Sequence, residues 1–191
     1  MKVYTRKGDD GTTGLLYGGR VPKTSPVIVA NGSVDEAQAA LGVVRAEVQP
    51  GSEVDGILVG IERDLYVLMA ELATAPDNRA KLMAGTTLVT PAMVATLERL
   101  IDDLTGRFPP LTDFVVPGHD RVAAGLDVAR TVIRRAEREA LLAAPLDSQV
   151  VAYLNRLSDL VWTMARWQEH GDSLLSRRVP PTADAVGGME S

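Results

Sequence analysis

The chain has 191 residues, of which 46% are hydrophobic and 24% charged, a composition typical of one globular domain and unlike that of a disordered protein. With no cysteine and only two histidines, it has no residues for a disulfide scaffold, a thiolate metal site or a cysteine nucleophile, and few for a histidine metal site or a Ser-His-Asp triad. A net charge of −5 with 4% aromatic residues argues against a nucleic-acid partner, and short apolar runs without a leader-like segment predict a cytoplasmic protein that does not span a membrane.

Residues 4–23 (YTRKGDDGTTGLLYGGRVPK) show no sustained hydrophobic period and are rich in glycine, threonine and aspartate, so they predict a loop or a short irregular hairpin. Within them, residues 8–14 (GDDGTTG) offer backbone N–H groups that side chains do not shield, and such a loop is able to cradle phosphates. It is not a Walker A motif, because Gly14 and Gly19 are followed by Arg20 instead of Lys-Ser or Lys-Thr, and no buried strand precedes it. By itself, a loop of this composition is more often a plain turn.

Five amphipathic helical stretches follow, each with apolar residues spaced three and four apart. Ser33 and Glu36 have the spacing of a capping box, so the first helix is expected to begin at Ser33. Thr90 and Pro91 have the pattern of a helix cap and first helical residue. The expected helices span residues 33–49, 53–75, 91–107, 120–142 and 148–168.

Helices of this length joined by short linkers predict an all-α fold, an antiparallel five-helix bundle that follows an irregular N-terminal loop. We assign residues 1–170 to one domain, in which residues 1–25 form the loop and residues 26–170 the helical bundle. Residues 171–191 are rich in proline, glycine, serine and charge and are predicted to form a flexible C-terminal tail.

Positive charge is concentrated in two places. Residues 1–23 and residues 121–138 each carry a net charge of +3, whereas the rest of the chain carries −11. Two positive islands in an acidic protein indicate a focused site for a small polyanion. Two independently solvated faces explain the same pattern equally well.

In the second island, Arg130, Arg134 and Arg138 recur at every fourth residue, which stacks like charges on one helix face. Glu137 offsets only part of this repulsion, so phosphates or a carboxylate from another helix would relieve the rest. The segment alone favours the alternative, an exposed basic face with scattered surface ion pairs.

Polar residues also follow one stripe of the last expected helix. Asn155, Ser158, Asp159 and Thr163 lie on it beside an apolar face, where they either line a pocket or, as is more common, mark the solvated side. Asp35 lies in the first turn of the first expected helix, where an acid usually does no more than favour the helix dipole. The alternative for Asp35 is a pair with an arginine across an interface.

Together these segments resemble the PduO-type ATP:corrinoid adenosyltransferases over most of the chain, from residue 3 to about residue 168. Five motifs occur in the order typical of that family, and chance does not account for all five. They are YTRKGDDGTTGLLYGGRVPK at 4–23, VDEAQAALG at 34–42, FVVPG at 114–118, ARTVIRRAER at 129–138 and YLNRLSDLVWTMAR at 153–166.

The resemblance implies a ferritin-like five-helix bundle with an irregular N-terminal nucleotide-binding loop. It implies that the bundle assembles as a homotrimer with active sites between adjacent subunits. It implies transfer of the 5′-deoxyadenosyl group of ATP to the cobalt of cob(I)alamin, with Mg²⁺ accompanying ATP and tripolyphosphate as the leaving product. A flavin-type reductase and a B12-dependent mutase are further partners that it implies. The rival hypotheses are a non-catalytic trimeric carrier or sensor of nucleotide or adenosylcobalamin, and a helical scaffold without a small-molecule site.

The resemblance also assigns residues to the site. Phe114 matches the aromatic residue on the lower face of the corrin, and Asp35 matches an aspartate that pairs with the arginine at position 130 across the subunit boundary. Asn155 matches an asparagine near the nucleotide. Residues matching the ATP loop and its phosphate contacts are Thr5, Arg6, Gly8, Asp9, Gly11, Thr12, Thr13 and Lys23, and those matching the arginine-rich helix are Arg130, Arg134, Arg135 and Glu137. The resemblance implies a catalytic group of Arg130, Arg134, Glu137 and Phe114, and no metal ligand from the protein.

The implied chemistry needs no protein nucleophile, because cob(I)alamin is itself a strong one, and this agrees with the missing cysteine and triad. Loop N–H groups, Lys23 and the arginines suit the positioning of ATP and the neutralisation of the leaving tripolyphosphate. The resemblance implies that Phe114, backed by Val115 and Val116, forms an apolar wedge that excludes the lower axial ligand of cobalt and water. Removing that ligand makes cobalt(II) easier to reduce.

Four positions depart from the family pattern. Lys7 stands where the family usually has threonine, which predicts a change in one phosphate contact. Pro26 replaces a usual arginine, Asn31 a usual tyrosine and Gln38 a common asparagine. These three predict a different geometry, or a different affinity for ATP, where the loop joins the first helix.

Overall fold

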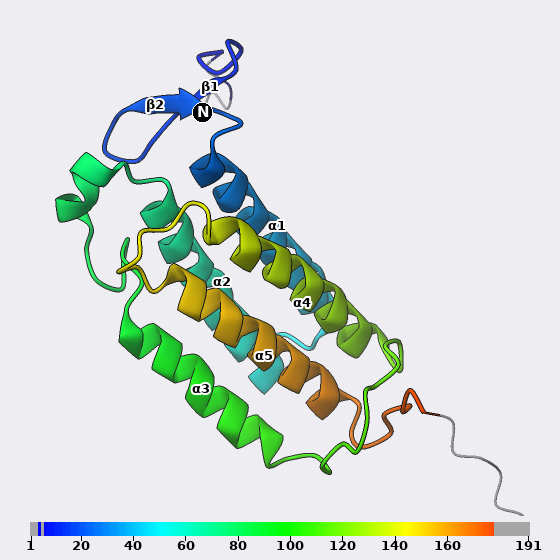
Figure 1. Cartoon of the computed structure of the whole chain (residues 1–191). Coiled ribbons are helices and arrows are strands. Elements are labelled where there is room, and N and C mark those ends of the chain that lie inside the picture. The colour runs from blue at the N-terminus through cyan, green and yellow to red at the C-terminus, as the bar shows by residue number, and fades with distance from the viewer. Residues whose placement is uncertain (1–3, 5, 178–191) are drawn as a thin grey trace, which may run out of the picture.

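The computed structural model describes Tyr4 and residues 6–177, which fold into helices and one small hairpin (Figure 1). The predicted all-α five-helix bundle is confirmed, and the hairpin lies within residues 4–23 as expected. Thr5 and residues 178–191 of the predicted tail lie outside the described residues. The elements are β1 (Thr12–Gly14), β2 (Arg20–Pro22), α1 (Pro26–Glu47), α2 (Glu53–Leu72), the 3₁₀ helix η1 (Pro76–Lys81), α3 (Pro91–Thr105), α4 (Arg121–Ala140) and α5 (Val150–Gln168).

Helix α4 occupies the middle of the bundle, packed between α1 and α5 and antiparallel to both (Figure 1). Helix α2 packs against α1, and α3 packs against α5. Helix α2 also contacts α5, where the Tyr153 hydroxyl donates to the Asp64 carboxylate at 2.9 Å, so the helices form a closed bundle. No helix in the described part of the chain is both long enough and apolar enough to cross a membrane.

The core is built from the apolar stripes that the sequence predicts. Of the residues that the sequence predicts to face inward on α1 and α4, Val122 is half-buried and the others are buried: Val34, Ala37, Leu41, Val44, Leu126, Ala129, Ile133 and Ala136. Helices α1 and α4 approach closely at Gly125, where a Cβ would lie 2.9 Å from Cγ2 of Val44. A glycine at this point lets the central helix lie tightly against its neighbour.

The first helix begins at Pro26, seven residues before the predicted start at Ser33, so that prediction was wrong. Ser25 is the N-cap residue and Pro26 the first helical residue, a position where the missing N–H and fixed φ of proline suit a helix. Ser33 lies buried in the middle of the helix, where its hydroxyl donates to the Glu139 carboxylate of α4. Burial of Ala30 one turn earlier outweighs the local capping pattern and extends the helix backwards.

Two other predicted helix starts are confirmed by their caps. The Thr90 hydroxyl accepts a hydrogen bond from the Met93 N–H at 3.3 Å, and Asp120 accepts from the N–H groups of Val122 and Ala123 at 2.8 and 2.9 Å. The remaining helix boundaries lie within three residues of the predicted ones.

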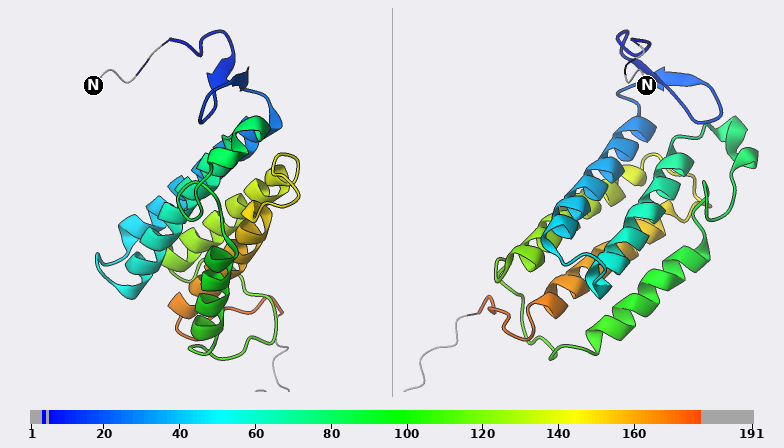
Figure 2. Two further views of the ribbon diagram at one scale, coloured as in Figure 1. Left: turned by 90° about the vertical axis from the view of Figure 1, so that its left-hand side faces the viewer. Right: turned by 180° about the vertical axis from the view of Figure 1, so that it is seen from behind.

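The hairpin extends beyond the end of the bundle at which α1 begins (Figures 1 and 2). Its strands pair in an antiparallel register with Thr13 opposite Val21. The turn of the hairpin is fixed to the C-terminal end of α2, because the Leu16 N–H donates to the Ala73 carbonyl at 2.8 Å. This bond anchors one side of the hairpin and leaves the glycine-rich side projecting from the bundle.

At the opposite end of the bundle, the segment before α4 pairs with the segment after α5. The Val116 N–H donates to the Leu174 carbonyl at 2.8 Å, and the Ser176 N–H donates to the Phe114 carbonyl at 2.7 Å. Residues 171–177, which the sequence assigned to the tail, thus include a paired segment that supports the 114–116 loop.

Candidate active site

Polar contacts between its own residues close the glycine-rich loop. The Asp10 carboxylate accepts hydrogen bonds from the Thr12 hydroxyl (2.7 Å) and N–H (2.9 Å), and these hold the pKa of this carboxyl below its ordinary value. Arg20 Nη2 donates to the Thr12 hydroxyl and to the Lys7 carbonyl, each at 2.5 Å. The Thr12 hydroxyl is therefore part of the internal frame of the loop.

Lys23 reaches back over the glycines of the loop. Its backbone N–H donates to the Gly11 carbonyl at 2.9 Å, and Gly11 has a φ of +80°, which favours glycine. A Cβ on Gly8 would lie 3.2 Å from Lys23 Nζ and 3.1 Å from the Thr12 carbonyl oxygen. Glycine at this position leaves room for the ammonium group, so the loop combines exposed backbone with a cation, as an anion site requires.

The other described loop residues that the resemblance assigns to ATP lie around this point. Arg6 and Asp9 are exposed, and the Asp9 N–H donates to the Arg6 carbonyl at 3.4 Å. The Arg6 guanidinium lies 5.6 Å from the centroid of the Tyr4 ring. Thr13 is half-buried in β1. The structure thus brings the described loop members of the predicted ATP-binding set together in one exposed loop, whereas the members on α4 and α5 lie in the bundle.

The arginines of α4 differ in how they are held. Arg130 Nε lies 3.3 Å from the Asp127 carboxylate, and Arg135 pairs with Glu36 of α1. Arg134 is exposed and forms no ion pair with any residue that the structure describes. The predicted basic face is therefore partly neutralised within the chain, and Arg134 is the arginine most available to an anion.

Glu137 of α4 and Asn155 of α5 come together, as their shared assignment to the nucleotide site predicts. Asn155 Nδ2 donates to Glu137 Oε1 at 3.1 Å. The predicted polar stripe of α5 is nevertheless divided, since Asp159 and Thr163 line a hollow of about 440 Å³ between α3 and α5 instead. Only the Asn155 side of the stripe faces the arginine-rich helix.

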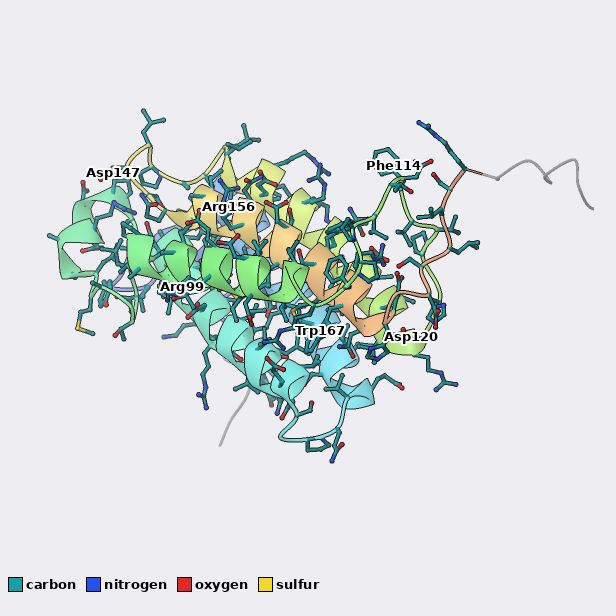
Figure 3. The ribbon with its side chains drawn as sticks, turned by 90° about the horizontal axis from the view of Figure 1, so that it is seen from below. Arg99, Phe114, Asp120, Asp147, Arg156 and Trp167 are labelled. Carbon is teal, nitrogen blue, oxygen red and sulfur yellow. The ribbon has the colours of Figure 1, made fainter. Side chains whose placement is uncertain are left out.

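Phe114 lies at the tip of its loop with 85% of the side chain exposed. In Figure 3 it projects from the end of the bundle that is remote from Asp147. Val116 behind it is also exposed. With this exposure, the ring makes little contact with the core of its own chain.

Next to the Phe114 loop, a hollow of about 330 Å³ lies against α4. Its lining includes Pro117, Gly118 and Val128 together with Asp127 and Arg130. One chain therefore brings the predicted residue Arg130 next to the predicted FVVPG loop. The ATP loop lies at the other end of the bundle (Figures 1 and 2), so a single chain does not join all the parts.

Asp35 is exposed on α1. Within the chain Arg130 is paired with Asp127, so the expected partnership of Asp35 with the arginine at position 130 is not made inside one subunit by the described residues. This agrees with the expectation that it forms between subunits, which one chain does not test.

Sequence reasoning missed three residues that hold the site, namely Asp10, Arg20 and Asp127. The spacing of Asp10 and Thr12 is a signal for a local turn in which the side chain accepts the backbone N–H. Asp127 and Arg130 are three apart on a helix, which is a signal for an ion pair. Arg20 had no local signal, since its contacts depend on the hairpin register.

Two of the four departures from the family pattern, Asn31 and Gln38, lie where α1 packs against α2. Asn31 Nδ2 donates to the Met69 carbonyl at 2.8 Å, and Gln38 Nε2 donates to the Glu62 carbonyl at 3.3 Å. Both amides therefore fasten α1 to α2. Pro26 starts α1, and Lys7 alone among the four lies in the glycine-rich loop.

A protein-held metal ion has no ligand set in the described residues, where no three histidine or carboxylate side chains are grouped to hold one. The hard oxygen ligands that Mg²⁺ prefers would come mainly from nucleotide phosphates. The loop and Arg134 supply positive charge and hydrogen-bond donors, which suit phosphates and not a bare cation.

Comparison with known proteins gives a consistent result. The family model described as cobalamin adenosyltransferase matches residues 3–168. The chain is 38% identical over 182 residues to a corrinoid adenosyltransferase of Mycobacterium leprae (92% of this chain and 95% of the relative) and 40% identical over 168 residues to a cobalamin adenosyltransferase of Cupriavidus metallidurans (86% of each). A variant of the PduO-type ATP:corrinoid adenosyltransferase of Lactobacillus reuteri, solved with cobalamin and ATP, superimposes with a TM-score of 0.81 at 29% identity, over 93% of this chain and all of that one.

Proposed function

The chain belongs to the cobalamin adenosyltransferase family, and from this premise we infer that it is an enzyme that transfers the 5′-deoxyadenosyl group of ATP to the cobalt of cob(I)alamin. The observation that carries the inference is that the matched region contains both the loop with Lys23 over Gly8 and the arginine-rich α4. A carrier of the finished cofactor would need no cradle for a triphosphate.

In the proposed reaction, the lone pair of cobalt(I) attacks C5′ of ATP. The carbon–cobalt bond forms as the bond between C5′ and the phosphate oxygen breaks, and tripolyphosphate leaves with that electron pair. The nucleophile belongs to the substrate, so the protein is left with alignment and charge stabilisation. This division of labour suits a chain without cysteine.

Lys23 and the glycine loop are proposed to hold the triphosphate, and Arg134 to meet the charge that grows on the leaving group. Mg²⁺ is proposed to arrive with ATP, bound by phosphate oxygens. Glu137 orients Asn155, which is proposed to contact the nucleotide. Phe114 is proposed to cover the lower face of the corrin and so to keep water and the lower ligand from cobalt.

A homotrimer is part of the proposal. The ATP loop and the Phe114 loop lie at opposite ends of one chain, so a site that uses both is supported best if a second subunit supplies one of them (Figures 1 and 2). The exposed Asp35 would then meet Arg130 of a neighbouring subunit. A cytoplasmic location, a flavin-type reductase and a B12-dependent acceptor enzyme complete the proposal, since cobalt(I) needs a strong reductant and ATP is abundant in the cytoplasm.

The decisive experiment is to mix the protein anaerobically with ATP, Mg²⁺ and chemically reduced cobalamin, and to follow the absorbance spectrum of adenosylcobalamin. Growth of that spectrum above a no-protein control is expected, and its absence would remove the enzyme function. Arg134→Ala should weaken ATP binding by about 1.5–3 kcal/mol, the worth of a hydrogen bond to a charged group. The matched control is Arg99→Ala, an arginine of α3 that hydrogen-bonds only Thr96 among the described residues and should leave ATP affinity unchanged.

A further inference from the structure

Below the hollow at Arg130 lies a buried cluster of charges that the proposed reaction does not use, formed by Asp127, Arg166 and Glu169. Arg166 and Asp127 are 2% and 5% exposed, and Glu169 is fully buried. Arg166 Nη2 lies 2.6 Å from Asp127 Oδ2 and 2.9 Å from Glu169 Oε1. One guanidinium therefore serves a carboxylate on α4 and another at the end of α5.

One arm of the cluster leads to Arg130. While Asp127 Oδ2 accepts from Arg166, its Oδ1 accepts from Arg130 Nε at 3.3 Å. This contact uses the inner nitrogen of Arg130, and no described residue accepts a hydrogen bond from its two outer nitrogens. Asp127 thus orients the guanidinium group of Arg130 and leaves its two Nη atoms available as donors at the hollow.

The other arm leads to the Phe114 loop. The free oxygen of Glu169 accepts a hydrogen bond from the Ser173 hydroxyl. Ser173 immediately precedes the segment whose Leu174 and Ser176 pair with Val116 and Phe114. The backbone on which Phe114 stands is therefore connected to Arg166 through one carboxylate and one hydroxyl.

Stability does not explain why this cluster exists. Taking charges out of water costs several kcal/mol for each ion, and well-packed apolar residues in place of a buried ion pair are often as stable or more so. Arg166 Nε and Glu169 Oε1 also lie buried without a hydrogen-bond partner among the described residues. The contact between Arg166 and Glu169 is therefore an ion pair without hydrogen-bond geometry, and both atoms add to the cost. What a charged cluster adds, and an apolar one lacks, is fixed direction for the groups at its two ends.

We propose that Arg166 is a positioning residue that sets Arg130 and the Phe114 loop relative to one another, through Asp127 on one arm and Glu169 with Ser173 on the other. The proposal rests on the proposed adenosyl transfer. It adds that Arg130, a member of the implied catalytic group, contacts ATP with its outer nitrogens, while Phe114 contacts the corrin. It predicts that a substitution in one arm changes mainly the KM of one substrate, whereas a substitution of Arg166 changes the KM values of both.

The test uses the full chain and steady-state kinetics for both substrates. Arg166→Met is expected to raise the KM for ATP and for the corrinoid and to lower kcat/KM by roughly 10- to 100-fold, the cost of misplaced reacting groups. Asp127→Asn should raise mainly the KM for ATP, and Ser173→Ala mainly the KM for the corrinoid. The matched control is Arg45→Met, which removes an arginine held by Asp55 and Glu62 away from the cluster and should leave both KM values within twofold of wild type.

A spectroscopic measurement separates positioning from simple loss of fold. The absorbance of bound cob(II)alamin in the presence of ATP reports the fraction without a lower axial ligand. That fraction should fall for Arg166→Met and Ser173→Ala and stay at the wild-type value for Asp127→Asn. If Arg166→Met does not fold, the two single-arm variants decide, and equal effects of both on both substrates would overturn the proposal.

An apolar version of the cluster provides the strongest contradiction test. In the triple variant Asp127→Leu, Arg166→Met, Glu169→Met, the melting temperature is expected to recover toward wild type while kcat/KM stays low. Recovery of kcat/KM together with stability would show that the cluster only fills space, and so would an Arg166→Met protein whose two KM values match wild type. Wild-type protein that forms no adenosylcobalamin at all would instead contradict the proposed function.

Discussion

The N-terminal hairpin and the α4–α5 interface each contain an aspartate beside an arginine, and the two pairs are held in opposite ways. Asp10 is exposed, lies 3.6 Å from Arg20 and depends on bonds from Thr12 within the same turn. Asp127 is buried, lies 2.6 Å from Arg166 and joins two helices that are far apart in sequence. Water competes with every polar contact in the hairpin and with almost none at the interface.

The difference divides ligand recognition into two parts. The loop is shaped by glycine and local turns, and it is free to adjust around a triphosphate at small cost to the whole fold. Burial holds the charged groups between α4 and α5 in one geometry. Loss of one partner therefore leaves a buried unpaired charge and destabilises the fold strongly. Substitutions in the first region should change binding alone, whereas those in the second should change binding and stability.

The largest expected effect comes from removing the buried carboxylate. Asp127→Ala leaves Arg166 buried without its closest partner, and we expect a loss of about 3–5 kcal/mol in the free energy of unfolding, measured by urea denaturation. The exposed counterpart Asp10→Ala should leave the unfolding midpoint at its wild-type value while weakening ATP binding, because it disorders only the loop. Equal stability losses for the two variants would erase the distinction between the regions.

The next largest effect concerns the close approach of α1 and α4. Gly125→Ala places a Cβ 2.9 Å from Cγ2 of Val44, and overpacking of this kind costs about 1–3 kcal/mol. The higher helix propensity of alanine offsets roughly 1 kcal/mol of this cost. We therefore expect the free energy of unfolding, measured by thermal denaturation, to fall by about 1 kcal/mol. Val44→Ala combined with Gly125→Ala should recover part of the lost stability if the clash is the cause.

The corresponding glycine of the loop should affect binding instead. Gly8→Ala puts a Cβ 3.2 Å from Lys23 Nζ, which must move away from the glycines. We expect ATP affinity, measured by calorimetry, to fall about tenfold, which corresponds to roughly 1.4 kcal/mol, with an unchanged melting temperature. Gly14→Ala, at a glycine of β1 whose φ is ordinary and whose added Cβ would meet no atom within 4 Å, is the control for a general effect of stiffening the hairpin. An unchanged ATP affinity for Gly8→Ala would speak against Lys23 as a phosphate contact.

The smallest expected effect is a pH dependence on α2. Burial raises the pKa of the Asp64 carboxyl, against a hydrogen bond from the Tyr153 hydroxyl at 2.9 Å. A carboxyl whose pKa rises on folding makes the protein less stable as pH rises through that pKa. Asp64→Asn removes this penalty, so at pH 7 its free energy of unfolding should exceed that of wild type by less than about 1 kcal/mol. Near pH 3, where Asp64 is protonated, the variant and wild type should be equally stable.

Asp55 provides a control of opposite sign. Hydrogen bonds from the Gly51 N–H and from Arg45 lower the pKa of its carboxyl, so its ionised form stabilises the fold above the ordinary pKa. Asp55→Asn should therefore melt lower than wild type at pH 7, and the gap should close as pH falls through the lowered pKa. Gaps of the same sign for the two variants would contradict this assignment of causes.

The sequence by itself determined the helices and the presence of a short hairpin within residues 4–23. Periodic apolar residues specify a helix and its buried face, which is why Leu126, Ala129 and Ile133 are buried as predicted. Glycine-rich composition acts over a few residues, so a loop at residues 8–14 was predictable from the chain alone. The position of Lys23 over Gly8 depends instead on the register of the hairpin.

Tertiary structure alone decided which charges meet between helices. The local pattern predicts Ser33 as a helix cap, but its side chain is buried against Glu139 of another helix. Arg166 lies on an apolar face of α5, and no residue near it in sequence indicates that its partner is Asp127. Spacing along a chain tells which residues share one face of a helix, but contacts between helices depend on packing angles and on which helix lies next to which. Burial then strengthens the few charged pairs that result, and these pairs set the geometry of the proposed site.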